Sequence, residues 1–159
     1  MITIIKDHNI VDVKNSIKYL LDEASKSEKV RELAVEIVSS NPDHIAAIHS
    51  WVKANVQYVL DPVADGEIEL LTSPVRMANN YFEGKPLVGD CDCMSLLTTS
   101  LYRAVGIKSN FVMIDTKGKG FDHAVTQAYS YKLEEWVTVD TASEYPLGWE
   151  VTCYEKIII

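Results

Sequence analysis

The residue of this sequence best suited to chemistry is Cys91, which ends the run Gly89-Asp90-Cys91 where an amphipathic helix is predicted to begin. A cysteine is a nucleophile only as its thiolate, and the unpaired amides and dipole of a helix's first turn favour that charged form. Asp90 is a suitable cap for this helix, and amides of the same turn could stabilise an oxyanion. The pattern indicates attack by a thiol on a carbonyl.

A nucleophilic thiol needs a base beside it and a third group that orients the base. His123 opens one predicted strand, and Asp140 ends the next strand along the chain. Adjacent antiparallel strands place such side chains in one layer when they share a face. The spacing leaves room for one strand after the cysteine helix and for a hairpin after that. The sequence therefore predicts a triad of Cys91, His123 and Asp140.

Other residues could compete for the roles of base and orienting acid. Asp115 and Asp122 are alternative orienting acids, but Asp122 is adjacent to His123 and would point to the opposite face of a regular strand. His44 and His49 lie on a predicted helix, where an exposed or core-satisfied imidazole is the ordinary interpretation. None of these residues is preferred to the triad.

The three cysteines are too few and too unevenly placed for a disulfide framework. A bridge between Cys91 and Cys93 would close a strained small ring. We expect Cys93 and Cys153 to be buried structural residues. A zinc site formed by Cys91, Cys93 and a histidine is an alternative, although the sequence lacks a second closely spaced pair of ligands. We therefore expect no metal and no cofactor.

The elements that must position the triad change type along the chain, with helices first and strands after them. Asn41 is expected to cap the third helix, with Pro42 in its first turn, and Gly106 suits the left-handed position after the cysteine helix. The aromatic residues Trp51, Tyr58 and Trp136 are expected in the core. The predicted helices cover residues 13–24, 30–38, 41–55, 74–82 and 90–105. The predicted strands cover residues 58–60, 110–115, 123–130, 136–140 and a segment within 151–159.

This order of elements predicts an α+β fold, in which N-terminal helices and a cysteine-bearing helix pack on an antiparallel sheet. A chain of 159 residues is about the size of one domain. We expect a single domain over 1–159, with a helical lead-in over 1–60 and a catalytic core over 61–159. The irregular segment 61–88 is the candidate for the loop that faces the substrate.

Composition and charge exclude several classes of protein. The net charge of −8 argues against a protein that holds nucleic acid, because phosphate binding needs a clustered basic surface. No stretch reaches the roughly 18 apolar residues of a membrane span, and the N-terminus lacks a signal-like pattern. We expect no nucleic acid or membrane partner and residence in the cytoplasm.

Several motifs resemble those of the transglutaminase-like cysteine-protease superfamily. The run from Gly89 to Asp92, with the apolar helix that follows it, resembles the nucleophile helix of that superfamily. His123 and the segment 136–140 resemble its histidine and aspartate strands. Five further stretches are similar to small stand-alone members from bacteriophages and prophages: residues 30–34, 51–58, 61–62, 73–74 and 146–148.

This resemblance implies a papain-like core and thiol chemistry on the amides of a protein or peptide substrate, by hydrolysis or acyl transfer. Members commonly carry a second acidic residue where Cys93 stands here. No side-chain donor for an oxyanion is identified, and Gln57 and Asn80 are only candidates. The resemblance also implies a second class of function: a virion or assembly protein, bound to phage structural proteins, that keeps the fold with weak or no catalysis.

Overall fold

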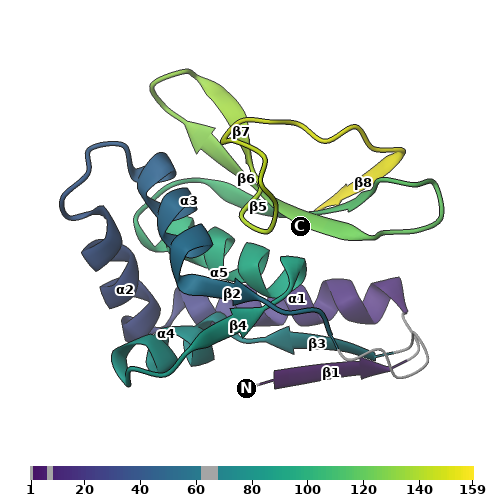
Figure 1. The fold of residues 1–159 in the computed structure, drawn as a ribbon, viewed down its shortest axis with the longest axis horizontal. Helices are drawn as coiled ribbons and strands as arrows, with labels where there is room; N and C mark the ends of the chain where they lie inside the picture. Colours follow the sequence, from purple (N-terminus) through teal and green to yellow (C-terminus); the bar gives the residue numbers. More distant parts are fainter. Residues whose placement is uncertain (1, 7–8, 62–67) are drawn as a thin grey trace.

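The computed structural model describes residues 2–6, 9–61 and 68–159. Helix α5 (Cys91–Ala104) lies in the middle of the molecule. A four-stranded sheet lies on one side of α5 and shorter paired strands lie on the other, with the remaining helices around it (Figure 1). This arrangement of helices and an antiparallel sheet confirms the predicted α+β fold class.

The other helices are α1 (Ile10–Ser25), α2 (Glu28–Val38), α3 (His44–Asn55) and α4 (Pro74–Phe82). Each begins after a polar residue whose side chain accepts a hydrogen bond from the first turn. The predicted cap of the third helix is wrong. Asp43 caps α3 by accepting from the amide of Ala46, whereas Asn41 accepts from the amide of Asp43 in the preceding turn. Pro42 therefore lies before the helix.

The main sheet is antiparallel, with the strand order β7-β6-β5-β8. Its strands are β5 (Ser109–Asp115), β6 (His123–Ser130), β7 (Glu135–Val139) and β8 (Glu155–Ile158). Their bounds agree with the predicted strands to within one residue at most ends. Sequence patterns thus located every strand of this sheet.

Two short strand pairs lie on the opposite side of α5 (Figure 1). β1 (Ile2–Lys6) pairs antiparallel with β3 (Ile68–Thr72), and β2 (Val56–Tyr58) pairs parallel with β4 (Leu87–Gly89). Both β3 and β4 fall in the segment that the sequence predicted to be irregular. Residues 62–67 of that segment lie outside the described residues.

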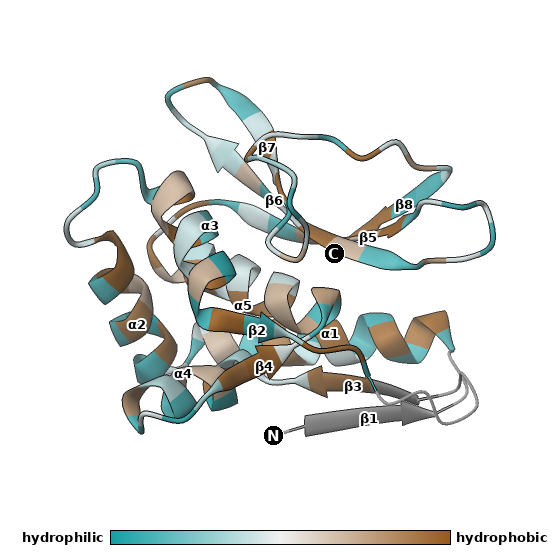
Figure 2. Ribbon diagram, viewed as in Figure 1, coloured by the Kyte–Doolittle hydropathy of each residue, from teal (hydrophilic) through white to brown (hydrophobic). Residues whose placement is uncertain are grey.

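The core surrounds α5, where every residue from Cys93 to Tyr102 is buried. One face of the helix packs on β5 and β6, and its other sides meet α1, α2, α3 and α4. Figure 2 shows hydrophobic residues along β5 and hydrophilic residues in the turn that follows it. Because each fully buried leucine contributes about 1.5–3 kcal/mol, this packing fixes the position of the helix firmly. The helix is open to solvent at its two ends, at the half-buried Cys91 and Asp92 of its first turn and at the exposed Arg103 of its last.

Among the described residues, no helix combines the length and the apolar character needed to cross a membrane.

Candidate active site

His123 and Asp140 are joined by a hydrogen bond between β6 and the end of β7. The ring nitrogen Nε2 of His123 lies 2.7 Å from Oδ2 of Asp140, as the sequence predicted for a base and its orienting acid. A carboxylate can only accept, so Nε2 carries the hydrogen. In the neutral ring, Nδ1 then carries the lone pair that can take a proton.

Asp140 is buried, with 1% of its surface exposed, and both of its carboxylate oxygens are bonded. Oδ1 accepts a hydrogen bond from the amide of Ala142 at 3.0 Å. Burial alone would raise the pKa of Asp140, but the hydrogen bond and charge of His123, with bonds from Ser143 and Ala142, lower it below its usual value. Asp140 is therefore ionised at neutral pH and can stabilise an imidazolium.

Cys91 is the first residue of α5 and is half-buried. It packs against a cluster of buried residues that includes Ala124, the neighbour of His123 in β6. The predicted cap is confirmed, because Oδ1 of Asp90 accepts from the amides of Asp92 at 3.1 Å and Cys93 at 3.2 Å. These two amides bind the cap, so neither is left to stabilise an oxyanion as the sequence had suggested.

Cys93 is a structural residue, as predicted. Its Sγ donates to the carbonyl of Leu70 and accepts from the amide of Thr72, both at 3.3 Å, and thereby ties α5 to β3. Burial raises the pKa of this thiol to about 12. Cys153 is half-buried on the far face of the sheet, against Val112 and its neighbours.

The zinc alternative finds no support in the geometry. Over residues 2–6, 9–61 and 68–159, no group of three or more His, Cys, Asp or Glu side chains is arranged to hold a metal ion. Cys93, one of the ligands considered, directs its sulfur toward the backbone of β3.

Gly89 is required by the close approach of β4 to α5. A Cβ atom at this position would lie 2.5 Å from Cβ of Cys93, well inside contact distance. The glycine of the Gly89-Asp90-Cys91 run thus allows the strand to deliver the cysteine to the start of the helix.

The competing acids and histidines are used elsewhere. Asp115 accepts from the amides of the following turn, residues 117–120, and Asp122 accepts from the amide and hydroxyl of Thr116. His44 is exposed at the start of α3. His49 is buried and bonds the backbone of Asp140. The preference for Asp140 over the other acids therefore agrees with the geometry.

The prediction that Tyr58 is a core aromatic is wrong. Tyr58 is 45% exposed, as is Trp136, because each lies on a strand at an edge. The β2–β4 register sets Tyr58 opposite Gly89. Burial raises the pKa of Tyr58, and the nearby charges of Cys91, Asp90, Asp92 and, least of all, Asp140 raise it further. The phenol therefore keeps its proton and lies within electrostatic reach of Cys91 and Asp140.

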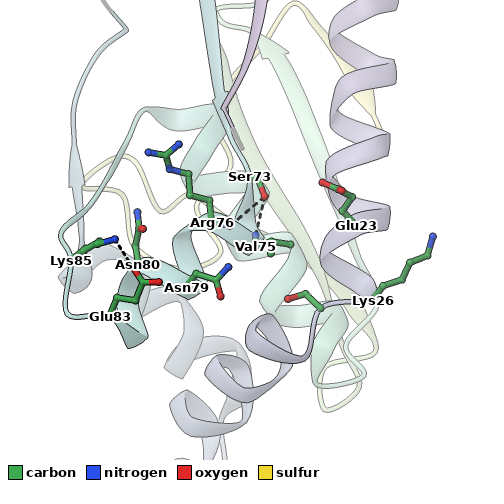
Figure 3. A pocket seen from close by; sticks show the side chains of 10 residues that line it. Glu23, Lys26, Ser73, Val75, Arg76, Asn79, Asn80, Glu83 and Lys85 are labelled. Atoms are coloured by element: carbon green, nitrogen blue, oxygen red, sulfur yellow. Dashed lines mark hydrogen bonds and ion pairs between the residues drawn. The ribbon is translucent and has the colours of Figure 1, made fainter.

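Neither predicted oxyanion donor is supported by the structure. Gln57 precedes Tyr58 in β2, and successive residues of a strand point to opposite faces. Asn80 lines a cavity of about 700 Å³ between α1 and α4, shown in Figure 3. The residues that line this cavity are Glu23, Lys26, Ser27, Ser73, Val75, Arg76, Asn79, Asn80, Glu83 and Lys85, with none of the predicted triad among them.

Comparison with known proteins gives a family and a fold. The model of the Transglutaminase-like superfamily matches residues 31–141. No curated protein sequence matches the chain. A candidate cysteine protease from Cytophaga hutchinsonii is similar in structure, with a TM-score of 0.56, 20% identity, 99% of this chain covered and 58% of its own.

Two further structures share the fold at low identity. A candidate protease from Parabacteroides distasonis has a TM-score of 0.56 and 13% identity over 79% of this chain and 25% of its own. LapG from Legionella pneumophila has a TM-score of 0.50 and 16% identity over 80% of this chain and 73% of its own. The chain thus spans little more than half of the Cytophaga hutchinsonii protein and a quarter of the Parabacteroides distasonis protein.

Proposed function

The chain belongs to the transglutaminase-like superfamily, and from this premise we propose that it is a thiol enzyme that acts on amide or peptide carbonyls through Cys91, His123 and Asp140. The observation that carries the proposal is the bond of 2.7 Å between His123 and the buried carboxylate of Asp140. An imidazole held in this way keeps Nδ1 as the base, and a cysteine stands at the first turn of the neighbouring helix.

In the proposed reaction, Nδ1 of His123 takes the proton of Cys91, and the resulting thiolate attacks the carbonyl carbon. The carbon–nitrogen bond then breaks as the imidazolium returns its proton to the leaving amine, which leaves a thioester on Cys91. Water or a second amine next attacks the thioester and gives a proton to His123. The thiol is released when it regains that proton, so the enzyme returns to its starting state.

The Tyr58 hydroxyl is the side-chain donor that we assign to the oxyanion of this reaction. Its support is the register that sets Tyr58 opposite Gly89, two residues before Cys91, together with the effect of the Cys91 charge on its pKa. Loss of one oxyanion donor costs about 10²-fold or more in a well-formed site, and less where the donor is partly exposed. Tyr58→Phe should therefore lower kcat about tenfold with little change in KM. An unchanged kcat would remove Tyr58 from the site.

The first test uses an activated ester, p-nitrophenyl acetate, as a general acyl donor for a nucleophilic thiol. The proposal expects release of p-nitrophenol and an acetyl group trapped on the peptide that contains Cys91. Both signals should disappear in Cys91→Ala and fall strongly in His123→Ala, while Cys153→Ser serves as the matched thiol control. Equal turnover by wild type and Cys91→Ala would overturn the proposal. Addition of a primary amine then separates hydrolysis from acyl transfer by the product formed.

A second candidate function is a bacteriophage virion or assembly protein that keeps this fold with weak or no catalysis. It is favoured by Cys93, a buried thiol where members of the superfamily commonly carry an acid, and by the phage-like stretches of the sequence. Copurification with capsid or tail particles, and full infectivity of a phage that carries Cys91→Ala, would support it. Turnover that requires Cys91 would count against a purely structural role.

A further inference from the structure

His49 makes a contact with the site that no pattern in the sequence predicts. Its ring nitrogen Nε2 lies 3.2 Å from the backbone carbonyl oxygen of Asp140. A carbonyl can only accept, so Nε2 of His49 carries the hydrogen and donates. This bond connects the middle of α3 to the residue that orients His123, across 91 positions of the chain.

Asp140 is the first residue after the part of β7 that pairs with β6. The last pair of the β6–β7 ladder joins Thr126 and Val139, so Asp140 follows the end of the pairing. Its carboxylate is bonded to His123 and Ala142, and the contact with His49 fixes its carbonyl. The residue is therefore held at both its backbone and its side chain.

The surroundings of His49 keep it a rigid neutral donor. The side chain is 8% exposed, and Ile48 and Val52 of the same helix are fully buried in the core. Burial lowers the pKa of His49, and the charge of Lys53 lowers it further, while the Asp140 carbonyl and carboxylate act in the opposite direction. At neutral pH the ring thus donates one hydrogen bond through Nε2, and α3 is held in turn by its packing on α5.

We propose that His49 is a positioning residue, which fixes the backbone of Asp140 so that its carboxylate stays aligned with His123. This role rests on the proposed function, since it concerns the same three residues. A small displacement of a catalytic group can cost as much as 10²-fold in rate. Through Asp140, the bond from His49 therefore holds the imidazole of His123 in the orientation in which it can take the proton of Cys91.

The test compares two amides at position 49 that differ in reach. His49→Gln can place a donor where Nε2 stands, whereas the shorter His49→Asn and the apolar His49→Leu cannot. The measurements are kcat and KM on p-nitrophenyl acetate, and the pH profile of iodoacetamide alkylation at Cys91, located by mass spectrometry. We expect kcat to fall about tenfold in His49→Asn and His49→Leu with KM nearly unchanged, and the alkylation midpoint to rise by about one pH unit. His49→Gln should stay within about threefold of wild type.

Val52→Ala is the matched control for lost stability, because it removes buried side-chain volume from the same helix and leaves His49 in place. It should lower the melting temperature without moving the alkylation midpoint. If His49→Leu does not fold, the comparison of His49→Gln with His49→Asn still tests whether His49 positions Asp140. Equal kcat and equal alkylation midpoints in those two variants would overturn the positioning role while wild type remains active. An ordinary thiol profile in wild type itself would instead overturn the proposed function.

Discussion

The two sides of the first turn of α5 carry the same residue type in opposite surroundings. On the side toward the main sheet, Cys91 is half-buried and packs against the cluster that contains Ala124, next to His123. On the side toward β3, Cys93 is 2% exposed and its sulfur bonds the backbone of Leu70 and Thr72. Residues two positions apart on a helix differ by about 200° in direction, so the two thiols face different parts of the molecule.

The difference shows that the start of a helix does not by itself make a thiol reactive. Both cysteines lie in the first turn, where the dipole and the backbone amides favour a thiolate. Burial nevertheless raises the pKa of Cys93 to about 12. We therefore expect access to solvent and a neighbouring base to decide which cysteine reacts. Of the two, Cys91 is the one that packs against the cluster that contains Ala124, next to His123. Four predictions test this contrast.

The largest expected effect is the loss of activity when the sheet-facing thiol is removed. Cys91→Ser should lower turnover of p-nitrophenyl acetate by about 10³-fold or more, because serine at this position lacks a thiolate. Cys93→Ser, its matched control in the same turn, should keep turnover within about tenfold of wild type. Comparable losses in the two variants would remove the functional difference between the two sides.

The next effect concerns the acid that orients the base. Asp140→Asn should lower kcat about 10²-fold, since the neutral amide cannot stabilise an imidazolium and favours the wrong tautomer of His123. Asp122→Asn is the control, because Asp122 is adjacent to His123 but bonds Thr116. We expect it to retain kcat within about twofold. A larger loss of kcat in Asp122→Asn than in Asp140→Asn would show that Asp122, and not Asp140, orients His123.

The third prediction, on the β3 side of the turn, is a loss of stability that comes from packing and does not depend on the proposed reaction. Gly89→Ala places a methyl group 2.5 Å from Cβ of Cys93 and should lower the free energy of unfolding in urea by about 1–3 kcal/mol. Val88→Ala, at an exposed site of the same strand, should change it by less than about 0.5 kcal/mol. Adding Cys93→Ala should not restore stability, because alanine keeps the Cβ atom. Restoration would place the clash at the sulfur instead.

The last effect is the pH dependence of stability that Cys93 introduces. Because its folded-state pKa is raised from 9.0 to about 12, its contribution is present below pH 9 and is lost as pH rises toward 12. One such thiol changes the free energy of unfolding by at most about 1.4 kcal/mol per pH unit. Cys93→Ser should flatten the alkaline loss measured by urea unfolding, and Cys153→Ser should leave it unchanged. An unaltered slope in Cys93→Ser would contradict the burial of a protonated thiol.

Local patterns predicted most of the fold and the bond at the centre of the site. Helical periodicity located α1, α2 and α5, and alternation with turn residues located β5, β6 and β7. The pairing of His123 with Asp140 was predictable because a hairpin brings neighbouring strands together over a short stretch of chain. These features depend on residues that lie close in sequence.

Contacts between distant segments were not predictable in the same way. The register of β2 with β4 sets Tyr58 opposite Gly89, two residues before Cys91, yet each of these strands has only three residues, too few to show an alternating pattern. The bond from His49 to Asp140 depends on how α3 packs, which the spacing of apolar residues does not specify. The cap of α3 was misplaced for a simpler reason, since Asn41 and Asp43 both suit a cap and only the backbone path chooses between them.

The most direct test of the central claim is the pH dependence of Cys91 alkylation by iodoacetamide in wild type and in His123→Ala. The account predicts that Cys91 reacts well below the pH at which an ordinary thiol ionises, and that His123→Ala shifts its midpoint upward toward the ordinary value near 8.5. Cys93 should remain unmodified in the folded protein over the same range. An ordinary midpoint for Cys91 that is unchanged in His123→Ala would contradict the triad.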